Sequence, residues 1–443
     1  MRDFRLGQRR RYFDRRSWLY APMRVFLATL GATIALLAGT AAAAGAQTPP
    51  AQRALQRSLA RSMAKVGASS GAYVLDLNTG QVLFSAAPNT GRMPASVEKI
   101  YTTSTALLQL GPTQTFTTSV LGVGSRDPSG VWNGTLYLRG GGDPTFGAVG
   151  FDRTWYGTGT VLHSLIGALL KATGLTAVQG RIVGDESYFD SRRGTPATGF
   201  RRSFDVEGEL SALAYDRGFA TLHGTAFQTR PALFAAQQLA GGLRASGVKL
   251  IGPRFPISTG RTPAGATVLA SVQSPPISTL IALTNTPSDN YLAETLLKDI
   301  GARLGGAGTT AAGAAVVRAE LLSKFGISPR LNDGSGLSRS DSTSPLQVVT
   351  VLKSMATNSA FVDSLAVGGE TGTLQHEMTG TLAQGNCRGK TGTLHDVATL
   401  AGYCTARDGH TLAFAFMSNR IGSPDFVHQV EADMAVALAE YNG

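Results

Sequence analysis

The pattern Ser-x-x-Lys occurs three times in this sequence, at Ser62–Lys65, Ser96–Lys99 and Ser246–Lys249. In a helix this spacing places a hydroxyl and an amine on the same side of one turn, so the amine can reach the hydroxyl. A serine attacks a carbonyl group only when a base activates it, and a desolvated lysine can act as that base. Only Ser96 stands at the start of a long apolar helical run, where backbone N–H groups and the helix dipole favour developing negative charge. The context therefore predicts Ser96 as a nucleophile and Lys99 as its base.

Two further patterns occur once each, Ser288-Asp289-Asn290 and Lys390-Thr391-Gly392-Thr393. The first alone could be an ordinary helix cap, and the second could be the polar end of a strand. Their order after Ser96-x-x-Lys99, at spacings of 192 and 102 residues, is far more specific than any single member. The three patterns together indicate an acyl-transfer centre.

Other catalytic arrangements are not supported. Gly67–Gly71 reads Gly-x-Ser-x-Gly, which in α/β-hydrolases leads from a strand into a helix, whereas here it leads from a helix into a strand. The six histidines are scattered without metal-binding spacing, so each is expected to be a surface or structural residue. We therefore expect no metal and no cofactor.

These motifs resemble those of the low-molecular-mass class C penicillin-binding proteins, the D-alanyl-D-alanine carboxypeptidase/endopeptidase family. The resemblance extends over nearly everything that follows residue 46. The class A β-lactamases share the three motifs but lack the run Asp333–Arg339. The segments that carry the resemblance are Met93–Ser96, Gly140–Thr145, Asp333–Arg339 (DGSGLSR) and Lys390–Leu394.

The resemblance implies a role for each matching residue. Ser96 would form the acyl-enzyme with Lys99 as its base, and Ser288 would relay a proton to the leaving group. Backbone N–H groups of Ser96 and Thr393 would form the oxyanion hole that acyl transfer requires. The residues expected to bind substrate are Asn290 at an amide, Lys390, Thr391 and Thr393 at the terminal carboxylate, and Ser338 and Arg339 along the site.

The expected function is that of a serine-type D-Ala-D-Ala carboxypeptidase that acts on peptidoglycan stem peptides. Cleavage of peptide cross-links is expected as a second activity, and penicillins are expected to acylate Ser96. A serine β-lactamase is one alternative, which the DGSGLSR run disfavours. A non-catalytic peptidoglycan-binding module is another, which the three intact motifs disfavour.

The elements that must position these residues come from both chain ends. Ala72–Leu77 and Gln81–Ser85 predict a hairpin, and Val397–Tyr403 and Thr411–Met417 predict strands. With helical periodicity between them, they indicate an α/β (α+β) fold of the transpeptidase/serine β-lactamase type. Its antiparallel sheet would have five strands, with Lys390 on the edge strand. The predicted domains are 51–112 with 272–443, and an inserted smaller β-containing domain, 113–271.

The insert contains one clear helix, Pro231–Ala245. Longer members of the family that this sequence resembles carry an additional β-rich domain at one point of the insert. This sequence has only the short stretch between Leu213 and Gln228 there. Asp143 is interpreted as a turn-forming residue. Asp185 and Asp190 could reach the site or lie at the surface.

Charge and hydropathy indicate export. The net charge is +11, but residues 1–24 contribute +6 of it, and no basic stripe interleaved with aromatic residues follows, which disfavours nucleic acid as a partner. Residues 25–46 carry no charge and end in Ala-Gly-Ala, so residues 1–46 predict a signal peptide cleaved after Ala46. An uncleaved membrane anchor and translation from Met23 are alternatives. The catalytic part would lie outside the cytoplasm in each case.

The two cysteines, Cys387 and Cys404, lie at equal distances from the pair His395-Asp396. If that pair forms a hairpin turn, the cysteines face each other across two strands at a separation that suits a disulfide. Export makes their oxidation plausible. We therefore predict a disulfide that holds the strand carrying Lys390.

Overall fold

The computed structural model describes residues 48–252 and 256–443. The predicted signal peptide, residues 1–46, lies outside the described residues. Within the described part, no helix combines the length and the apolar character that crossing a bilayer requires.

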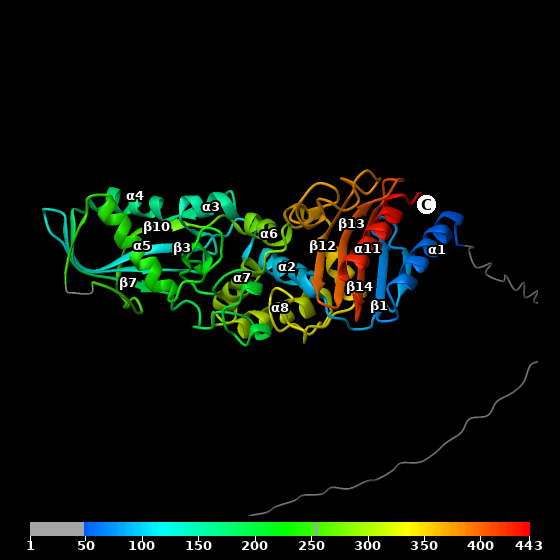
Figure 1. Ribbon diagram of the computed structural model, residues 1–443, viewed down its shortest axis with the longest axis horizontal. Helices are drawn as coiled ribbons and strands as arrows, with labels where there is room; N and C mark the ends of the chain where they lie inside the picture. The colour runs from blue at the N-terminus through cyan, green and yellow to red at the C-terminus, as the bar shows by residue number, and fades with distance from the viewer. Residues whose placement is uncertain (1–47, 253–255) are drawn as a thin grey trace, which may run out of the picture. The chain divides into compact units, whose positions relative to one another are not determined.

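The first sheet is antiparallel and joins strands from the two ends of the chain (Figure 1). Its central pairing is between β1 and β14, in which Ser70 lies opposite Ser418 and Asp76 lies opposite Leu412. The strand order is β11-β12-β13-β14-β1-β2. The strands are β1 (Ser70–Asp76), β2 (Val82–Ala86), β11 (Ala366–Val367), β12 (Cys387–Leu394), β13 (Val397–Thr405) and β14 (Thr411–Asn419).

The predicted α/β fold class is confirmed, but the prediction of five strands is wrong by one. The sixth strand, β11, has two residues, too few for the alternating pattern that reveals a strand in a sequence. It pairs only with Arg388 and Gly389 of β12. In the described part of the chain, residues 390–394 of β12 therefore form a free edge of the sheet, whereas Arg388 and Gly389 are covered by β11.

Helices cover both faces of this sheet. Successive strand residues point to opposite faces, so Phe414 and Phe416 pack with α1 and α11, while Ala413 and Ala415 pack with α2 and α9. Helix α2 is buried along nine consecutive residues, from Lys99 to Leu107. The helices of this part are α1 (Pro50–Lys65), α2 (Lys99–Leu110), α6 (Ile277–Asn285), α7 (Asn290–Leu304), α8 (Thr310–Phe325), α9 (Pro345–Met355), α10 (Ser359–Asp363) and α11 (Pro424–Ala439).

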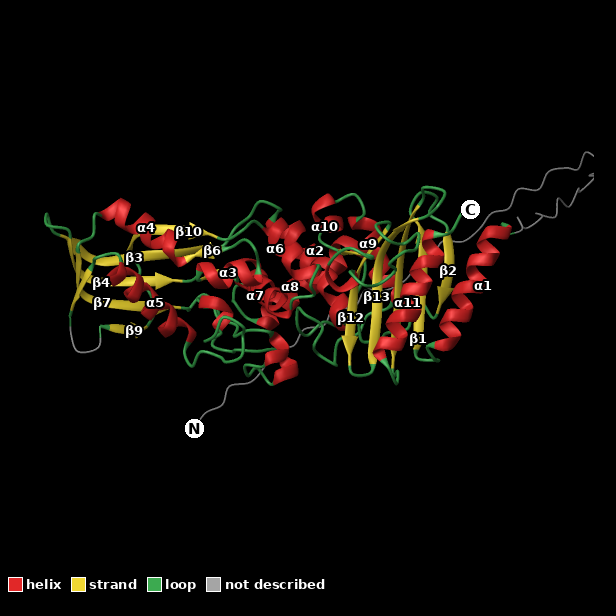
Figure 2. Ribbon diagram, turned by 45° about the horizontal axis from the view of Figure 1, so that its top comes forward, coloured by secondary structure: helices red, strands yellow, loops and turns green. Residues whose placement is uncertain are grey.

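A second sheet is built from residues 117–273, with the order β10-β3-β4-β7-β8 and β9 beside β7 (Figure 2). Strands β4 and β7 are parallel, and α4 lies in the connection between them. Its strands are β3 (Thr117–Arg126), β4 (Val131–Arg139), β7 (Ala177–Asp185), β8 (Lys249–Ile251), β9 (Ile257–Thr259) and β10 (Thr267–Gln273), and a separate small sheet pairs β5 (Phe146–Gly147) with β6 (Thr160–Val161).

Three α-helices among the described residues accompany the second sheet, where the sequence indicated one clear helix. Helix α5 has the predicted bounds, Pro231–Ala245. The other two, α3 (Val149–Trp155) and α4 (Leu162–Thr173), begin without a side-chain cap or an initial proline, so their starts carry no sequence signal. We propose the two predicted domains, 51–112 with 272–443 and 113–271, because each sheet draws its strands from one of these sets, except that β10 runs two residues past 271, to Gln273.

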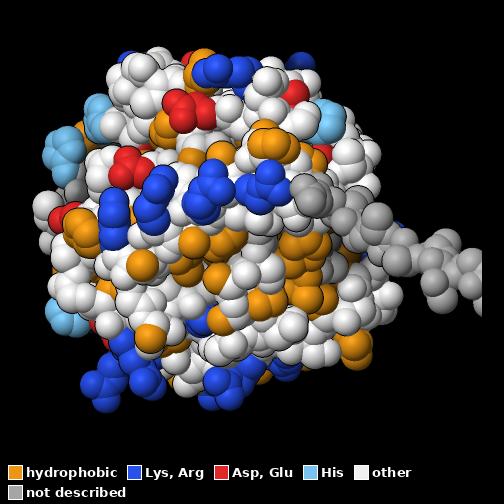
Figure 3. All heavy atoms as spheres, turned by 90° about the vertical axis from the view of Figure 1, so that its right-hand side faces the viewer, with side chains coloured by type: hydrophobic (Ala, Val, Ile, Leu, Met, Phe, Trp, Pro, Cys, Tyr) orange, Lys and Arg blue, Asp and Glu red, His pale blue; other side chains and the backbone are white. Residues whose placement is uncertain are grey.

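Helix α1 carries a row of exposed basic side chains. Arg53, Arg57, Arg61 and Lys65 recur every four residues, so they lie along one side of the helix. Figure 3 shows a row of basic side chains across this end of the sheet domain. The opposite side of α1 contributes Leu55 and Leu59 to the core.

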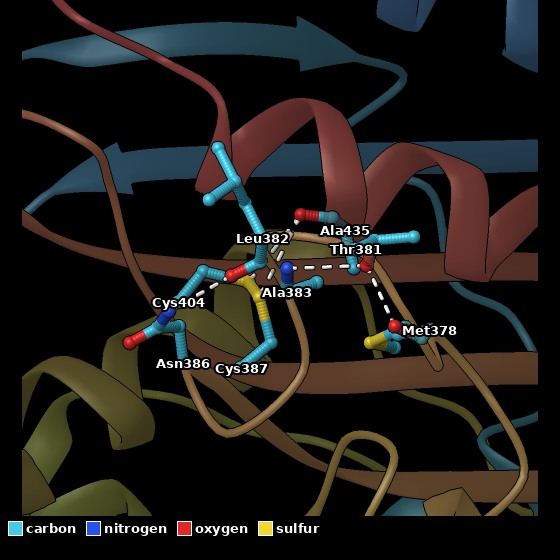
Figure 4. Close-up of a disulfide and its surroundings, with 8 residues drawn as sticks. All are labelled: Met378, Thr381, Leu382, Ala383, Asn386, Cys387, Cys404 and Ala435. Carbon is cyan, nitrogen blue, oxygen red and sulfur yellow. Dashed lines mark hydrogen bonds between the residues drawn. A yellow bond between two sulfur atoms is a disulfide. The ribbon is translucent and has the colours of Figure 1, made fainter.

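Cys387 of β12 and Cys404 of β13 form a disulfide, with 2.05 Å between the sulfur atoms (Figure 4). The strand register places these residues opposite each other and places Leu394 opposite Val397, so His395 and Asp396 are the turn. The two sulfur atoms lie 3.6 and 3.7 Å from the carbonyl oxygen of Ala435 in α11. The bond thus holds β12 to β13 beneath α11.

We predict that replacing both cysteines by serine lowers the free energy of unfolding by about 3 kcal/mol, because the bond closes a loop of 17 residues in the unfolded chain. Denaturant unfolding with and without a reductant measures this change. Reduction should destabilise the wild type and leave the double variant unaffected. Equal unfolding midpoints for both proteins would contradict the prediction.

Candidate active site

Ser96 lies on the short helix η1 (Ala95–Glu98), which leads directly into α2. The residue before it, Ala95, has a φ of 46°. A residue with a side chain adopts this left-handed conformation at a cost of about 1–3 kcal/mol, so the surrounding packing must impose it. Ser96 therefore lies at the start of a buried helix, as the sequence indicated, and a strained residue directly precedes it.

Lys99 is completely buried, and its Nζ lies within hydrogen-bond distance of three oxygens. These are the Oγ of Ser96 at 2.8 Å, the Oδ1 of Asn290 at 2.6 Å and the carbonyl oxygen of Ser335 at 2.9 Å. Burial lowers the pKa of Lys99 to about 8, against the opposing effect of nearby carboxylates. The amine therefore loses its proton more easily than an exposed lysine does.

The Ser288-Asp289-Asn290 motif forms the start of α7. Asp289 caps the helix by accepting a hydrogen bond from the N–H of Leu292 at 2.8 Å. Ser288 is half-buried and has a φ of 71°, a second strained residue at the site. The motif is therefore both a helix cap and, through Asn290, a direct neighbour of Lys99.

The Lys390-Thr391-Gly392 motif lies on β12, beside η1. A Cβ atom at Gly392 would lie 2.9 Å from the nitrogen of Ser96 and 2.7 Å from the carbonyl oxygen of Pro94, so only glycine fits there. Lys390 is completely buried, and its Nζ donates to the carbonyl oxygen of Thr391 at 2.8 Å. Burial, followed by the positive charge of Lys99, holds the pKa of Lys390 well below its usual value.

Thr391 and Thr393 project from the opposite side of β12 to Gly392, toward α11. The hydroxyl of Thr391 donates to that of Thr373 at 2.8 Å. The hydroxyl of Thr393 shares a hydrogen bond of 2.7 Å with Nε2 of His428, whose Nδ1 lies 2.9 Å from the buried Glu431. His428 was expected to be a surface or structural residue, and the sequence carries no spacing signal for this contact across 35 residues.

The DGSGLSR run reaches Lys99 through Ser335 rather than through Ser338 or Arg339. The backbone N–H of Ser338 donates to Asp333 at 2.8 Å, and Arg339 forms an ion pair of 2.8 Å with Asp396. Neither of these contacts involves Ser96 or Lys99. The sequence reasoning thus found the run but not the carbonyl group of Ser335 that contacts the amine.

A group of buried carboxyls supports the same loop. Oxygens of Glu98, Asp333 and Asp341 lie within 4.8 Å of one another, close enough in principle for a cation. Burial and mutual repulsion raise the pKa of Glu98 and of Asp333 well above the usual value, so neutral carboxyls can hydrogen-bond one another there. Glu294 accepts the N–H groups of Gly334 and Ser335, each at 2.9 Å. The group therefore shapes the loop that presents Ser335.

The insert contributes two side chains that hold the second motif in place. Arg217 is 1% exposed and pairs with Asp289 at 2.5 Å. Its guanidinium lies 4.8 Å from the ring centre of Tyr291. Glu207 accepts the backbone N–H of Asn290 at 2.9 Å, and the side-chain nitrogen of Asn290 donates to the carbonyl oxygen of Asp205 at 2.8 Å. No sequence motif marks these residues.

The other acids of the insert do not contact Ser96 or Lys99. Asp143 accepts the N–H and the hydroxyl of Thr145, as a turn-forming residue does. Asp190 pairs with Lys298 at 2.6 Å, and Asp185 accepts from Thr262 at 2.7 Å. Asp185 and Asp190 both line a pocket of about 530 Å³ that no motif residue lines.

The fold and the site define a class of protein, the serine-type penicillin-binding peptidases. Residues 51–201 and 197–441 match the D-Ala-D-Ala carboxypeptidase 3 (S13) family. The chain belongs to this family, which confirms the resemblance that the motifs indicated.

Curated relatives agree with this assignment. The D-alanyl-D-alanine carboxypeptidase of Actinomadura sp. (strain R39) is 30% identical, in a match that covers 85% of this chain and 82% of the relative. Carboxypeptidase DacB of Mycolicibacterium smegmatis is 31% identical and covers 79% of this chain and 76% of the relative.

Solved structures show the same fold. Penicillin binding protein 4 (dacB) from Haemophilus influenzae superposes with a TM-score of 0.70 at 21% identity, covering 86% of this chain and 99% of that one. The predatory peptidoglycan endopeptidase Bd3459 from Bdellovibrio bacteriovorus gives 0.55 at 17% identity, covering 84% and 93%.

We predict that Arg217→Met slows acylation of Ser96 by benzylpenicillin by at least about tenfold, because Asp289 would be left in a half-buried position without its partner and the start of α7 would move. Stopped-flow measurement of the acylation rate tests this. Arg202→Met is the matched control, since it also strips the buried carboxylate of Glu209 of its partner but touches no motif residue. Equal effects of both changes on rate would contradict a positioning role for Arg217.

Proposed function

We propose that this chain is a serine-type D-Ala-D-Ala carboxypeptidase with Ser96 as nucleophile and Lys99 as base. The contacts of the Lys99 amine carry the proposal. Two of its three partners, Asn290 Oδ1 and the Ser335 carbonyl oxygen, can only accept hydrogen bonds, whereas the third, the Ser96 hydroxyl, can also donate. A neutral amine would use its two N–H groups on the carbonyl oxygens and aim its lone pair at the Ser96 proton.

Acylation would begin when Ser96 Oγ attacks the carbonyl carbon between the two D-alanines while Lys99 takes the hydroxyl proton. The backbone N–H groups of Ser96 and Thr393 would hold the developing oxyanion, and the close packing of Gly392 against the nitrogen of Ser96 supports this placement. Ser288 would pass a proton to the departing amine. Water would then hydrolyse the ester and release the shortened peptide.

The remaining motif residues would bind the substrate. Lys390, Thr391 and Thr393 would hold the terminal carboxylate. The side-chain amide of Asn290 would bind the substrate amide, with Ser338 and Arg339 at the edge of the site. The hydroxyls of Thr391, which is half-buried, and Thr393, which is exposed, can donate hydrogen bonds to an anionic substrate terminus.

The substrate would be the stem peptide of peptidoglycan, with cross-link cleavage as a second activity and β-lactams as covalent inhibitors. The enzyme would act outside the cytoplasm after removal of residues 1–46, and oxidation of Cys387 and Cys404 suits that compartment.

We expect benzylpenicillin to add its mass to the wild-type protein on the peptide containing Ser96, and Ser96→Ala to abolish the adduct while the fold persists. Intact-mass spectrometry and circular dichroism measure the two effects. Ser62→Ala is the control, because Ser62 belongs to another Ser-x-x-Lys pattern at the exposed end of α1. Persistent labelling of Ser96→Ala would overturn the assignment. Rapid drug loss without an adduct would point to a β-lactamase.

We expect the acylation rate constant to rise with pH up to about 8 and to level off above it, because only neutral Lys99 can take the proton. The pKa of Lys99 is lowered from its usual value to about 8, so the neutral, active amine appears as the pH rises through about 8. The rate should fall about tenfold for each pH unit below it. A flat profile between about pH 6 and pH 9 would contradict Lys99 as the base.

A further inference from the structure

Helix α1 carries most of the net positive charge that follows residue 24. Its four charged residues, Arg53, Arg57, Arg61 and Lys65, are all basic, and we call them the basic row. The whole chain has a net charge of +11, of which residues 1–24 contribute +6, so +5 is left for the remainder. The basic row supplies four of these five charges, and everything outside it after residue 24 is nearly neutral.

Contacts within the protein do not account for the basic row. Like charges four residues apart repel each other along a helix, so the row does not stabilise α1. Its exposed side chains form no ion pair and no side-chain hydrogen bond with the residues that the structure describes. Glu440 of α11 lines a pocket with Ala54 and Ser58, so it borders the row without pairing with it.

The fold holds the basic row in place at the surface. Leu55 and Leu59 bury the opposite side of α1 in the core. The side chain of Gln56 donates a hydrogen bond of 2.9 Å to the carbonyl oxygen of Leu83 in β2. Over the length of the row the helix rises about 18 Å. Figure 3 shows the resulting line of basic side chains across this face of the molecule.

The position of the basic row in the chain favours a lipid membrane as its partner. Residues 25–46 carry no charge and are mostly apolar, and a run of about 20 such residues is long enough to enter a bilayer. Helix α1 begins at Pro50, the fourth residue after this run. The row therefore closely follows the segment that meets the membrane during the predicted export, whether that segment is then cleaved or retained.

The residues around the basic row suit a contact with lipid headgroups rather than insertion between lipid tails. The exposed residues between the basic ones include Ala54, Ala60 and Ala64, whose side chains are too short to reach the hydrocarbon layer. A helix that lies flat on the surface brings its cations to the phosphates of a single layer. Such a contact is electrostatic and weakens when salt screens it.

We propose that the basic row of α1 is a docking surface for the headgroups of anionic phospholipids, which holds the protein reversibly at a membrane surface. This inference does not depend on the proposed function. It concerns where the protein lies and not which bond it cleaves.

Docking through α1 leaves the motif residues uncovered. Helix α1 packs against α11 and β2, and β2 is the last strand at one end of the sheet. Strand β12, with Lys390, lies four strands away from β2. Neighbouring strands are about 4.8 Å apart, so β12 lies about 20 Å from the strand beside the docking helix.

The test uses protein purified after export and measures the fraction that sediments with vesicles at about 50 mM salt. One set of vesicles contains equal parts of phosphatidylglycerol and phosphatidylcholine, and the other contains phosphatidylcholine alone. Subtracting the second value removes any contribution of an apolar amino-terminal run. We expect the partition coefficient to be at least about tenfold higher for the anionic vesicles, and about 500 mM salt to abolish the difference.

The triple change Arg53→Gln, Arg57→Gln and Arg61→Gln tests the row itself. Each basic side chain near an anionic surface contributes roughly a fivefold factor, so the partition coefficient should fall at least about tenfold. Glutamine has nearly the helix propensity of arginine, so α1 is retained. Benzylpenicillin acylation should proceed at the wild-type rate and shows that the variant is folded.

A matched control removes the same amount of charge from the insert. Arg181, Arg244 and Lys249 are exposed and form no ion pair with the described residues, so their joint change to glutamine should leave vesicle binding at the wild-type level. An equal loss of binding in both triple variants would overturn the docking surface, because net charge alone would then explain it.

Two further outcomes would also overturn the proposal. One is that the wild-type protein sediments equally with both sets of vesicles at low salt. The other is that a soluble polyphosphate binds the protein through the row while the anionic vesicles do not, which would identify a polyanionic polymer as the partner. Loss of benzylpenicillin acylation in the wild-type protein would count against the proposed function alone and leave the docking surface standing.

Discussion

A lysine amine with no exposed surface must find all its hydrogen-bond partners inside the protein, and Lys99 finds them on three separate parts of the chain. Ser96 precedes it on η1, Asn290 opens α7, and Ser335 lies in the loop before α9. Because the amine cannot turn toward water, the positions of these three oxygens constrain one another. The other features of the site hold these three segments together: the glycine that lets β12 approach η1, the carboxyls beneath the Ser335 loop and the insert side chains at the start of α7.

Burial disfavours the charged form of every one of these buried acids and bases. It lowers the pKa values of the two lysines and raises those of Glu98 and Asp333, so it favours the neutral form of acids and bases alike. Beside these groups, the guanidinium of Arg217 lies 2.5 Å from a carboxylate oxygen of Asp289. One member of this pair, Arg217, comes from the insert, and the other, Asp289, belongs to the motif at the start of α7.

The motifs and the periodic elements were predictable from the sequence because they are local. Helix α5 was predicted with its observed bounds, and the cysteine spacing around His395-Asp396 gave the register of β12 and β13. The missed features depend on contacts between distant segments. Arg217 reaches Asp289 across 72 residues, and Ser335 contributes a carbonyl group, which every residue has and no pattern can mark. The two-residue strand β11 was too short to leave a pattern.

The pairing of β1 with β14 means that the sheet is closed only when strands from both ends of the chain meet. Strand β12, with Lys390, is attached to β1 only through β13 and β14, which are among the last segments in the sequence. A chain that emerges from its amino end first therefore contains Ser96 and Lys99 long before it contains the strand that packs against them. Until the carboxy-terminal segments arrive, the nascent chain has the residues of the centre but not their arrangement, so the centre is assembled only when synthesis of the chain is nearly complete.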